Sequence, residues 1–270
     1  MNDIVTRFAP SPSGRLHLGH AFSALKAYGL SAVQGGQFLL RIEDIDQGRC
    51  RPEYIDAIKQ DLQWLGIKWP EPVRIQSQHF NDYKKALDKL QAFGVIYPCF
   101  CTRRQITTAQ EADPLSAPHG PDGARYPGTC LHLTPQEVED QMNAGASFAL
   151  RLNVTKALDH VEHPLIWTEE GPKSPGETQA RPELLGDVVL ARKDTPTSYH
   201  LAVCVDDAIQ GVNLVVRGQD LFHATHIHCL IQDLLGLPRP RYFHHELITD
   251  SKGLRLATRS NANTLDNLRA

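Results

Sequence analysis

A strand, a loop and a helix follow one another within the first 33 residues, and this order constrains the fold more than any other feature. The apolar pair Ile4-Val5 begins a strand predicted over 4–9. A loop of Pro10-Ser11-Pro12-Ser13-Gly14 comes next, and apolar residues at helical spacing predict a helix over 21–33. The tetrapeptide His17-Leu18-Gly19-His20 stands where the loop meets the helix. The junction therefore places two histidines at a helix N-terminus.

The chemistry of this junction suits phosphate. A helix N-terminus offers unpaired backbone N–H groups and a partial positive charge. His17 and His20 can add donors to a phosphate oxygen, and Gly14 and Gly19 remove side chains where a nucleotide must approach closely. The alternative is an ordinary strand-to-helix turn with two incidental surface histidines. The whole run from 7 to 20 favours the phosphate site.

The stretch 1–98 has the pattern of an α/β fold. A second strand is predicted over 37–42, and helices over 52–65 and 80–93. Strands that alternate with helices predict a parallel sheet, with ligands at the carboxyl ends of its strands.

The stretch 99–185 is rich in proline and glycine turn signals, which predict an insertion domain of irregular structure. The last stretch, 186–270, returns to the α/β pattern. It contains predicted strands over 187–191 and 214–216 and a predicted helix over 221–235. The simplest architecture is a nucleotide-binding fold whose two halves, 1–98 and 186–270, are split by the insertion.

Composition narrows the function classes. The chain of 270 residues is 41% hydrophobic, which is ample for a buried core. It has no run of 18 apolar residues and no basic-plus-apolar leader, so we expect a cytoplasmic protein without a membrane span. A net charge of −3 neither supports nor excludes RNA binding. The six cysteines are expected to be thiols or metal ligands.

Four blocks of sequence resemble class I aminoacyl-tRNA synthetases of the glutamyl and glutaminyl branch. They cover residues 7–20, 38–46, 198–207 and 215–221. The resemblance implies an α/β fold, namely a split Rossmann-like class I catalytic domain with a zinc-stabilised insertion. It also implies amino-acid activation by ATP with Mg²⁺. Within the branch, the chain is most similar to short paralogues that attach glutamate to queuosine in the anticodon of tRNA(Asp). The expected partners are therefore glutamate, ATP and queuosine-containing tRNA(Asp), and we expect a monomer.

Recognition of glutamate needs groups that bind two carboxylates and one ammonium. Arginine binds carboxylates bidentately, a glutamate side chain pairs with an ammonium, and a tyrosine hydroxyl donates to a carboxylate. Taken alone, Arg217 is as well explained by a surface salt bridge, and Glu43 by a solvated acidic face. The resemblance instead assigns glutamate contacts to Arg7, Phe8, Ala9, Pro10, Ser11, Glu43, Tyr199 and Arg217.

The second class I signature is altered in this chain. Its lysine loop should read Lys-Leu-Ser-Lys-Arg, and the matching stretch is Arg255-Leu256-Ala257-Thr258-Arg259. Thr258 replaces the second lysine and brings no cation to the phosphates. Adenylate formation is therefore slowed, or Arg259 or Lys252 compensates. The resemblance assigns ATP contacts to His17, Gly19, His20, Arg255, Thr258 and Arg259, and the catalytic role to His17 and His20.

Three cysteines, Cys99, Cys101 and Cys130, have the soft ligands and loop-rich setting of a zinc site. The alternative is three free thiols. The fourth ligand is Tyr126, which the resemblance to the queuosine-type paralogues favours, or His132, which matches a Cys-x-His pattern of glutamyl-tRNA synthetases. We expect one Zn²⁺ per chain. A second metal site is not expected at the histidines of 223–228 and 244–245, because their spacing fits no common motif.

Two other functions stay open at this point. The chain could be the catalytic fragment of a glutamyl-tRNA synthetase, for which the Cys-x-His at 130–132 is the best support. It could also be a degenerate paralogue that binds glutamate or RNA without activating either, for which Thr258 is the support.

Overall fold

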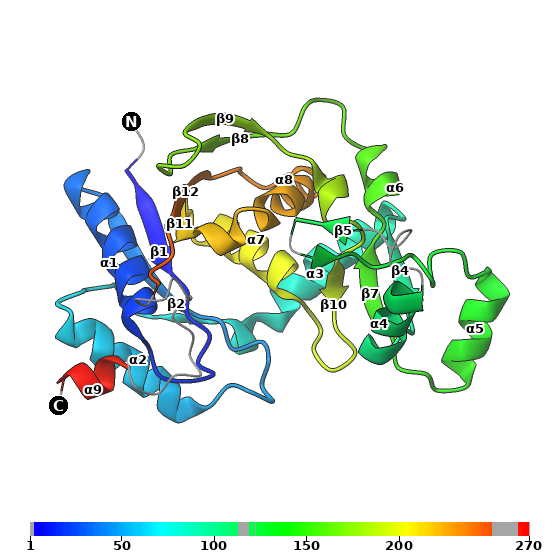
Figure 1. The fold of residues 1–270 in the computed structure, drawn as a ribbon, viewed down its shortest axis with the longest axis horizontal. Coiled ribbons are helices and arrows are strands. Elements are labelled where there is room, and N and C mark those ends of the chain that lie inside the picture. The colour runs from blue at the N-terminus through cyan, green and yellow to red at the C-terminus, as the bar shows by residue number, and fades with distance from the viewer. Residues whose placement is uncertain (1–2, 113–118, 122, 250–263, 270) are drawn as a thin grey trace.

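The computed structural model describes residues 3–112, 119–121, 123–249 and 264–269 (Figure 1). The α-helices are α1 (Leu18–Val33), α2 (Pro52–Trp64), α3 (Phe80–Ala92), α4 (Arg103–Ala112), α5 (Pro135–Asn143), α6 (Val154–Leu158), α7 (Tyr199–Ile209), α8 (Ala224–Leu235) and α9 (Leu265–Arg269). The strands are β1 (Val5–Phe8), β2 (Gln37–Ile42), β3 (Arg74–Ile75), β4 (Ile96–Cys99), β5 (His119–Gly120), β6 (Gly123–Ala124), β7 (Ala149–Leu152), β8 (Ile166–Glu169), β9 (Gly176–Gln179), β10 (Val189–Ala191), β11 (Leu214–Gly218) and β12 (Arg241–His245). Short 3-10 helices are η1 (Gln76–His79), η2 (Pro182–Leu184) and η3 (Gln219–Leu221).

Parallel strands from the two ends of the chain build the centre of the fold, as the sequence predicted. β1 pairs in parallel with β2, and β2 with β3. β11 pairs in parallel with β12, and β12 with β8. Asn213 joins the two sheets, because its backbone N–H donates to the Val5 carbonyl (3.1 Å) and its Oδ1 accepts from the Val5 N–H (2.9 Å). The carboxyl ends of β1, β2 and β11 consequently lie near one another.

Helix α1 lies against this junction through small residues. Ala21, Ala24 and Ala27 are buried, and they allow the helix to approach β1, β2 and β11 closely. The sequence pattern correctly predicted a helix, but its larger apolar residues do not all form the buried face. Phe22 and Val33 are 38% and 87% exposed.

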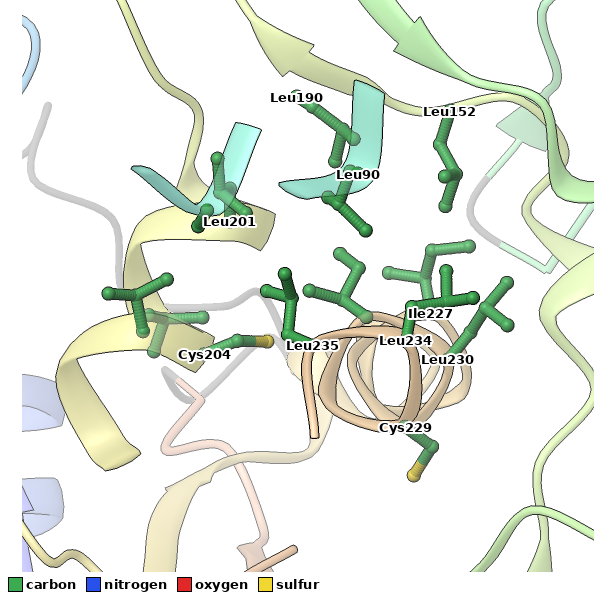
Figure 2. Packing of buried hydrophobic residues seen from close by; sticks show 14 of the residues in the cluster. Leu90, Leu152, Leu190, Leu201, Cys204, Ile227, Cys229, Leu230, Leu234 and Leu235 are labelled. Carbon is green, nitrogen blue, oxygen red and sulfur yellow. The ribbon is translucent and has the colours of Figure 1, made fainter. Parts of the chain in front are cut away.

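The larger hydrophobic core surrounds α8, which follows η3 and is buried on almost every side. Figure 2 shows α8 end-on, with Ile227, Leu230 and Leu234 facing Leu90 of α3 and Leu152 of β7. Helix α7 packs beside α8, although the sequence analysis had not predicted a helix there. A helix enclosed in this way has little polar face, so amphipathic periodicity gives only a weak signal for it.

A separate antiparallel sheet, ordered β10–β7–β4, lies toward the right of Figure 1. Helices α4 and α5 and the β5–β6 hairpin lie at this end. The β8–β9 hairpin also belongs to the segment 99–185, yet β8 pairs with β12 of the last stretch. Among the described residues, no helix is both long and apolar enough to cross a membrane.

Candidate active site

The first predicted feature, the pair His17 and His20, caps the N-terminus of α1. The His17 ring nitrogen accepts from the Gly19 N–H (3.1 Å), and the His20 ring accepts from the His17 N–H (3.2 Å). The two rings stack with centroids 3.8 Å apart. A Cβ on residue 19 would lie 3.0 Å from the His17 ring, so a side chain there would push the ring aside by a few tenths of an ångström. The helix start and both imidazoles thus form one rigid unit.

A cavity of about 250 Å³ lies beside this unit and gathers residues from all the predicted blocks. It opens at the carboxyl ends of β1 and β11, where ligands of parallel α/β folds are bound. Every residue assigned to glutamate by resemblance lines it, and so do three of the residues assigned to ATP. These residues are Arg7, Phe8, Ala9, Pro10, Ser11, Glu43, Tyr199 and Arg217, with His17, Gly19 and His20.

Arg217 is the most unusual group in this cavity. The residue is 5% exposed, yet within the described residues no carboxylate lies at ion-pair distance from its guanidinium. It donates to neutral acceptors instead: Nε to His244 Nε2 (3.0 Å), and the terminal nitrogens to Tyr199 Oη (3.1 Å), His228 Nδ1 (3.3 Å) and Thr225 Oγ1 (2.7 Å). A buried cation without a counter-ion is costly, so the cavity is electrostatically prepared for an anion.

The imidazoles around Arg217 are kept neutral by their surroundings. Burial lowers the pKa of His244 to about 4, against the opposing effect of its bond to Glu169. Burial and then the Arg217 charge lower the pKa of His228 well below its usual value. Burial and Arg217 also lower the pKa of His200, which contacts His228, to about 4. Near pH 7 these rings therefore add no positive charge to the site.

The other cavity arginine, Arg7, already has an anionic partner. Its Nε lies 3.0 Å from Asp207 Oδ1, and the same oxygen lies 2.8 Å from an Arg41 nitrogen. Burial alone would raise the pKa of Asp207, but the two arginines outweigh it and the pKa lies below its usual value. Arg7 is thus held in place by a buried ion-pair network, whereas Arg217 is left for a ligand.

Glu43 and Tyr199 complete the wall of the cavity. The Glu43 N–H donates to the Pro10 carbonyl (3.0 Å), and Ser11 Oγ donates to the Glu43 carbonyl (2.8 Å), so the ends of β1 and β2 are joined. Burial raises the pKa of Glu43, although Arg41, 3.4 Å away, lowers it. Tyr199 accepts a hydrogen bond from Arg217, so its own hydroxyl hydrogen can be donated to a bound carboxylate.

A larger cleft of about 1140 Å³ adjoins this cavity and shares Ser11, Glu43 and Tyr199 with it. Six arginine and lysine side chains line the cleft: Arg49, Arg103, Arg125, Arg151, Arg192 and Lys193. Three of the predicted metal ligands, Cys99, Cys101 and Tyr126, also line it.

The sulfur atoms of Cys99, Cys101 and Cys130 all lie within 4.8 Å of one another. The Tyr126 hydroxyl lies among them, 3.4 Å from Cys99 Sγ and 3.6 Å from Cys101 Sγ, and it accepts from the Cys130 N–H (2.8 Å). His132, the alternative ligand, is exposed. Three thiols and one oxygen that converge in this way suit a tetrahedral zinc ion.

Comparison with known proteins agrees with this geometry. The family model for the catalytic domain of class I tRNA synthetases (E and Q) matches residues 3–268. A glutamyl-Q tRNA(Asp) synthetase from Rhodobacter capsulatus is 47% identical over 99% of this chain and 95% of its own length. The chain belongs to the glutamyl-Q tRNA(Asp) synthetases of class I. A second member, from Nitratidesulfovibrio vulgaris, is 40% identical over 94% of this chain and 77% of its own length.

The fold of this synthetase family member is also found in a solved structure. The glutamate-tRNA synthetase of Elizabethkingia anophelis superposes with a TM-score of 0.78 over 96% of this chain, at 24% identity. The chain spans 53% of that longer protein. At this level of identity the likeness establishes the α/β class I catalytic fold alone.

The structure adds residues to the synthetase site that the sequence analysis missed. Arg41 and Asp207 fix Arg7, while Thr225, His228 and His244 hold Arg217. One signal was available, because a charged residue inside the apolar run 38–42 indicates a buried partner. The predicted ATP contacts Arg255, Thr258 and Arg259, with Lys252, lie outside the described residues.

Proposed function

We propose that this chain activates glutamate with ATP and transfers it to queuosine in the anticodon of tRNA(Asp). The cavity at the carboxyl ends of β1 and β11 would hold the amino acid and the α-phosphate side of ATP. The family membership supports the reaction class, and the similarity to two glutamyl-Q tRNA(Asp) synthetases supports the acceptor.

The buried, uncompensated Arg217 is the observation that carries the proposal. A substrate carboxylate would supply the missing counter-ion without displacing any protein carboxylate. Charge-assisted hydrogen bonds of this kind are worth about 1.5–3 kcal/mol each. An uncharged amide in the same place would leave the cation uncompensated, so the site favours glutamate over glutamine.

The remaining polar groups suit the other parts of glutamate. Glu43 would accept the ammonium, and ligand binding would then favour its ionised form despite the raised pKa. Tyr199 would donate to a carboxylate. The main-chain segment from Arg7 to Ser11 would contribute contacts along one wall, because all five of its residues line the cavity.

Activation requires no protein nucleophile, because the substrate carboxylate itself attacks the α-phosphorus of ATP. The protein must align the reactants and stabilise charge on phosphate oxygens. We assign this role to His17 and His20 and to the positive end of the α1 dipole, which the ligand can approach closely because Gly19 has no side chain. Mg²⁺ bound with ATP would supply further positive charge.

We propose that Cys99, Cys101, Tyr126 and Cys130 hold one zinc ion. The position of the Tyr126 hydroxyl among the sulfur atoms supports it over His132 as fourth ligand. The ion would be structural, because it would tie the end of β4 to the loop that contains Cys130.

The acceptor RNA would approach through the cleft of about 1140 Å³, whose basic lining suits a phosphate backbone. We further propose the three-part division 1–98, 99–185 and 186–270, and a monomer.

One experiment tests the function directly. The protein is incubated with radiolabelled glutamate, ATP, Mg²⁺ and tRNA(Asp) that either contains or lacks queuosine. We expect label only on the modified tRNA. A parallel reaction with tRNA(Glu) tests the first alternative, because label at its acceptor end and none on tRNA(Asp) would support an ordinary glutamyl-tRNA synthetase. A lack of glutamate-dependent ATP–pyrophosphate exchange would support a non-catalytic paralogue.

A further inference from the structure

We propose that Glu169 is a positioning residue for glutamate binding, which it supports by fixing the tautomer of His244 and thereby the orientation of Arg217. The inference deepens the proposed function and rests on it for the identity of the ligand. The side chains of Glu169, His244 and Arg217 form a continuous chain from β8 through β12 to β11.

The geometry of this chain is compact and buried. Arg217 and His244 are cross-strand neighbours, and Arg217 Nε lies 3.0 Å from His244 Nε2. His244 Nδ1 lies 2.7 Å from Glu169 Oε2. The three side chains are 5% exposed or less.

The hydrogen bonds allow one assignment of the imidazole protons. Arginine Nε carries a hydrogen and can only donate, so His244 Nε2 must be the acceptor. The ring proton of a neutral His244 is then on Nδ1, where it donates to Glu169. If His244 carried a proton on Nε2, two N–H groups would face each other at 3.0 Å and Arg217 would be displaced.

Glu169 is built to remain an ionised acceptor. Its Oε1 accepts from the backbone N–H groups of Gly171 and His244, both at 2.9 Å, and its Oε2 accepts from the Trp167 indole (3.3 Å) as well as from His244. A Cβ on residue 171 would come within 2.6 Å of Glu169 Oε1, so glycine is required at this position. The carboxylate is therefore fixed by four donors and has no freedom to rotate away from His244.

The arrangement also explains how a buried arginine can stay without a direct counter-ion. The negative charge of Glu169 is held one imidazole away, so it does not take the one N–H group that Arg217 keeps beyond its four bonds to neutral acceptors. Within the described part of the chain, His244 is the residue that contacts Arg217 on one side and a carboxylate, that of Glu169, on the other.

Glu169→Gln tests the proposal, because the amide keeps the size of the side chain but turns one acceptor into a donor. We expect the KM for glutamate in ATP–pyrophosphate exchange to rise about tenfold or more, with little change in kcat or in the KM for ATP. Glu170→Gln is the matched control, since the neighbouring carboxylate bonds to Arg241 and does not line the cavity. It should leave the glutamate KM unchanged.

A double-mutant cycle separates positioning from a merely structural role. In a His244→Phe background, Glu169→Gln should cause no further rise in the glutamate KM, because the transmitting ring is gone. Additive effects of the two substitutions would overturn the proposal, and so would an unchanged glutamate KM in Glu169→Gln alone.

A spectroscopic readout decides the proposal independently of activity. Nitrogen-15 NMR of the wild-type protein, with His244 identified by the signal lost in His244→Phe, should show the Nδ1–H tautomer. An Nε2–H tautomer would overturn the relay even if the chain activates glutamate. Conversely, if wild-type protein showed no glutamate-dependent exchange, the proposed function would fail while the tautomer would still decide the relay.

Discussion

Replacing Arg217 by methionine should weaken glutamate activation strongly and leave the protein folded. Methionine preserves most of the side-chain volume but brings neither charge nor donors. In the native site the guanidinium donates only to neutral acceptors, so its removal leaves no carboxylate unpaired among the described residues.

The size of the effect follows from the number of contacts a substrate carboxylate would lose. Four of the five Arg217 N–H groups donate to protein acceptors, so a substrate carboxylate would receive one charge-assisted hydrogen bond, worth about 1.5–3 kcal/mol. Because 1.4 kcal/mol is a factor of ten, kcat/KM for glutamate should fall roughly tenfold to a hundredfold. The KM for ATP should stay within about threefold of the wild-type value, since the loss is confined to glutamate contacts.

Arg41→Met is the matched control for stability. Arg41 is fully buried and lies 2.8 Å from Asp207 and 3.8 Å from Asp206. Its loss would strip a buried carboxylate of a partner, which typically costs about 3–5 kcal/mol. We therefore expect a much lower melting temperature for Arg41→Met than for Arg217→Met.

Pyrophosphate exchange at varied glutamate and thermal melting together provide the assay. An Arg217→Met protein that activates glutamate with unchanged kcat/KM would refute the assignment of the carboxylate site. Equal losses of stability in the two variants would refute the argument that Arg217 lacks a structural counter-ion.

Three further predictions concern the metal, the altered lysine loop and pH. Metal analysis should find about one zinc per chain. Tyr126→Phe should lower the zinc affinity, whereas His132→Ala should not. Full zinc retention after replacement of Cys99, Cys101 and Cys130 would contradict the site. Thr258→Lys should raise the rate of pyrophosphate exchange by up to roughly a hundredfold, because one positioned cation is commonly worth a few kcal/mol in the transition state. If Thr258→Lys left this rate unchanged and neither Arg259→Ala nor Lys252→Ala lowered it, the loop would not carry the ATP chemistry. Burial lowers the pKa values of His200, His226 and His244 to about 4, so between pH 6.5 and 4 the unfolded chain binds more protons than the folded one. The free energy of unfolding should therefore fall as the pH falls, by about 1.4 kcal/mol per unit of pKa difference. A melting temperature that is constant from pH 7 to pH 5 would contradict the prediction that these buried imidazoles are neutral.

The sequence alone determined the local elements and the residue types of the site. Strands and helices at both ends of the chain follow from periodicity and from the loop of prolines and glycines, and β2 has the predicted bounds, 37–42. The motif blocks indicated which side chains to expect at the strand ends, because their spacing is a property of the chain. The inner face of α1 was beyond this reasoning, since close packing against a sheet selects alanines that carry little hydrophobic signal.

Only the tertiary structure decided which charges compensate one another. Arg7 and Arg217 are the same residue type, so the sequence does not distinguish them. In the structure, Arg7 bonds to Asp207, a residue 200 positions away, whereas Arg217 bonds to neutral imidazoles. The same holds for Glu169, which is 75 positions from His244 and lies in a segment that the sequence assigned to the insertion. The electrostatic role of a side chain depends on its burial and on its distance from other charges. For residues far apart in the sequence, both are set by the packing of the sheet, which no local sequence pattern encodes.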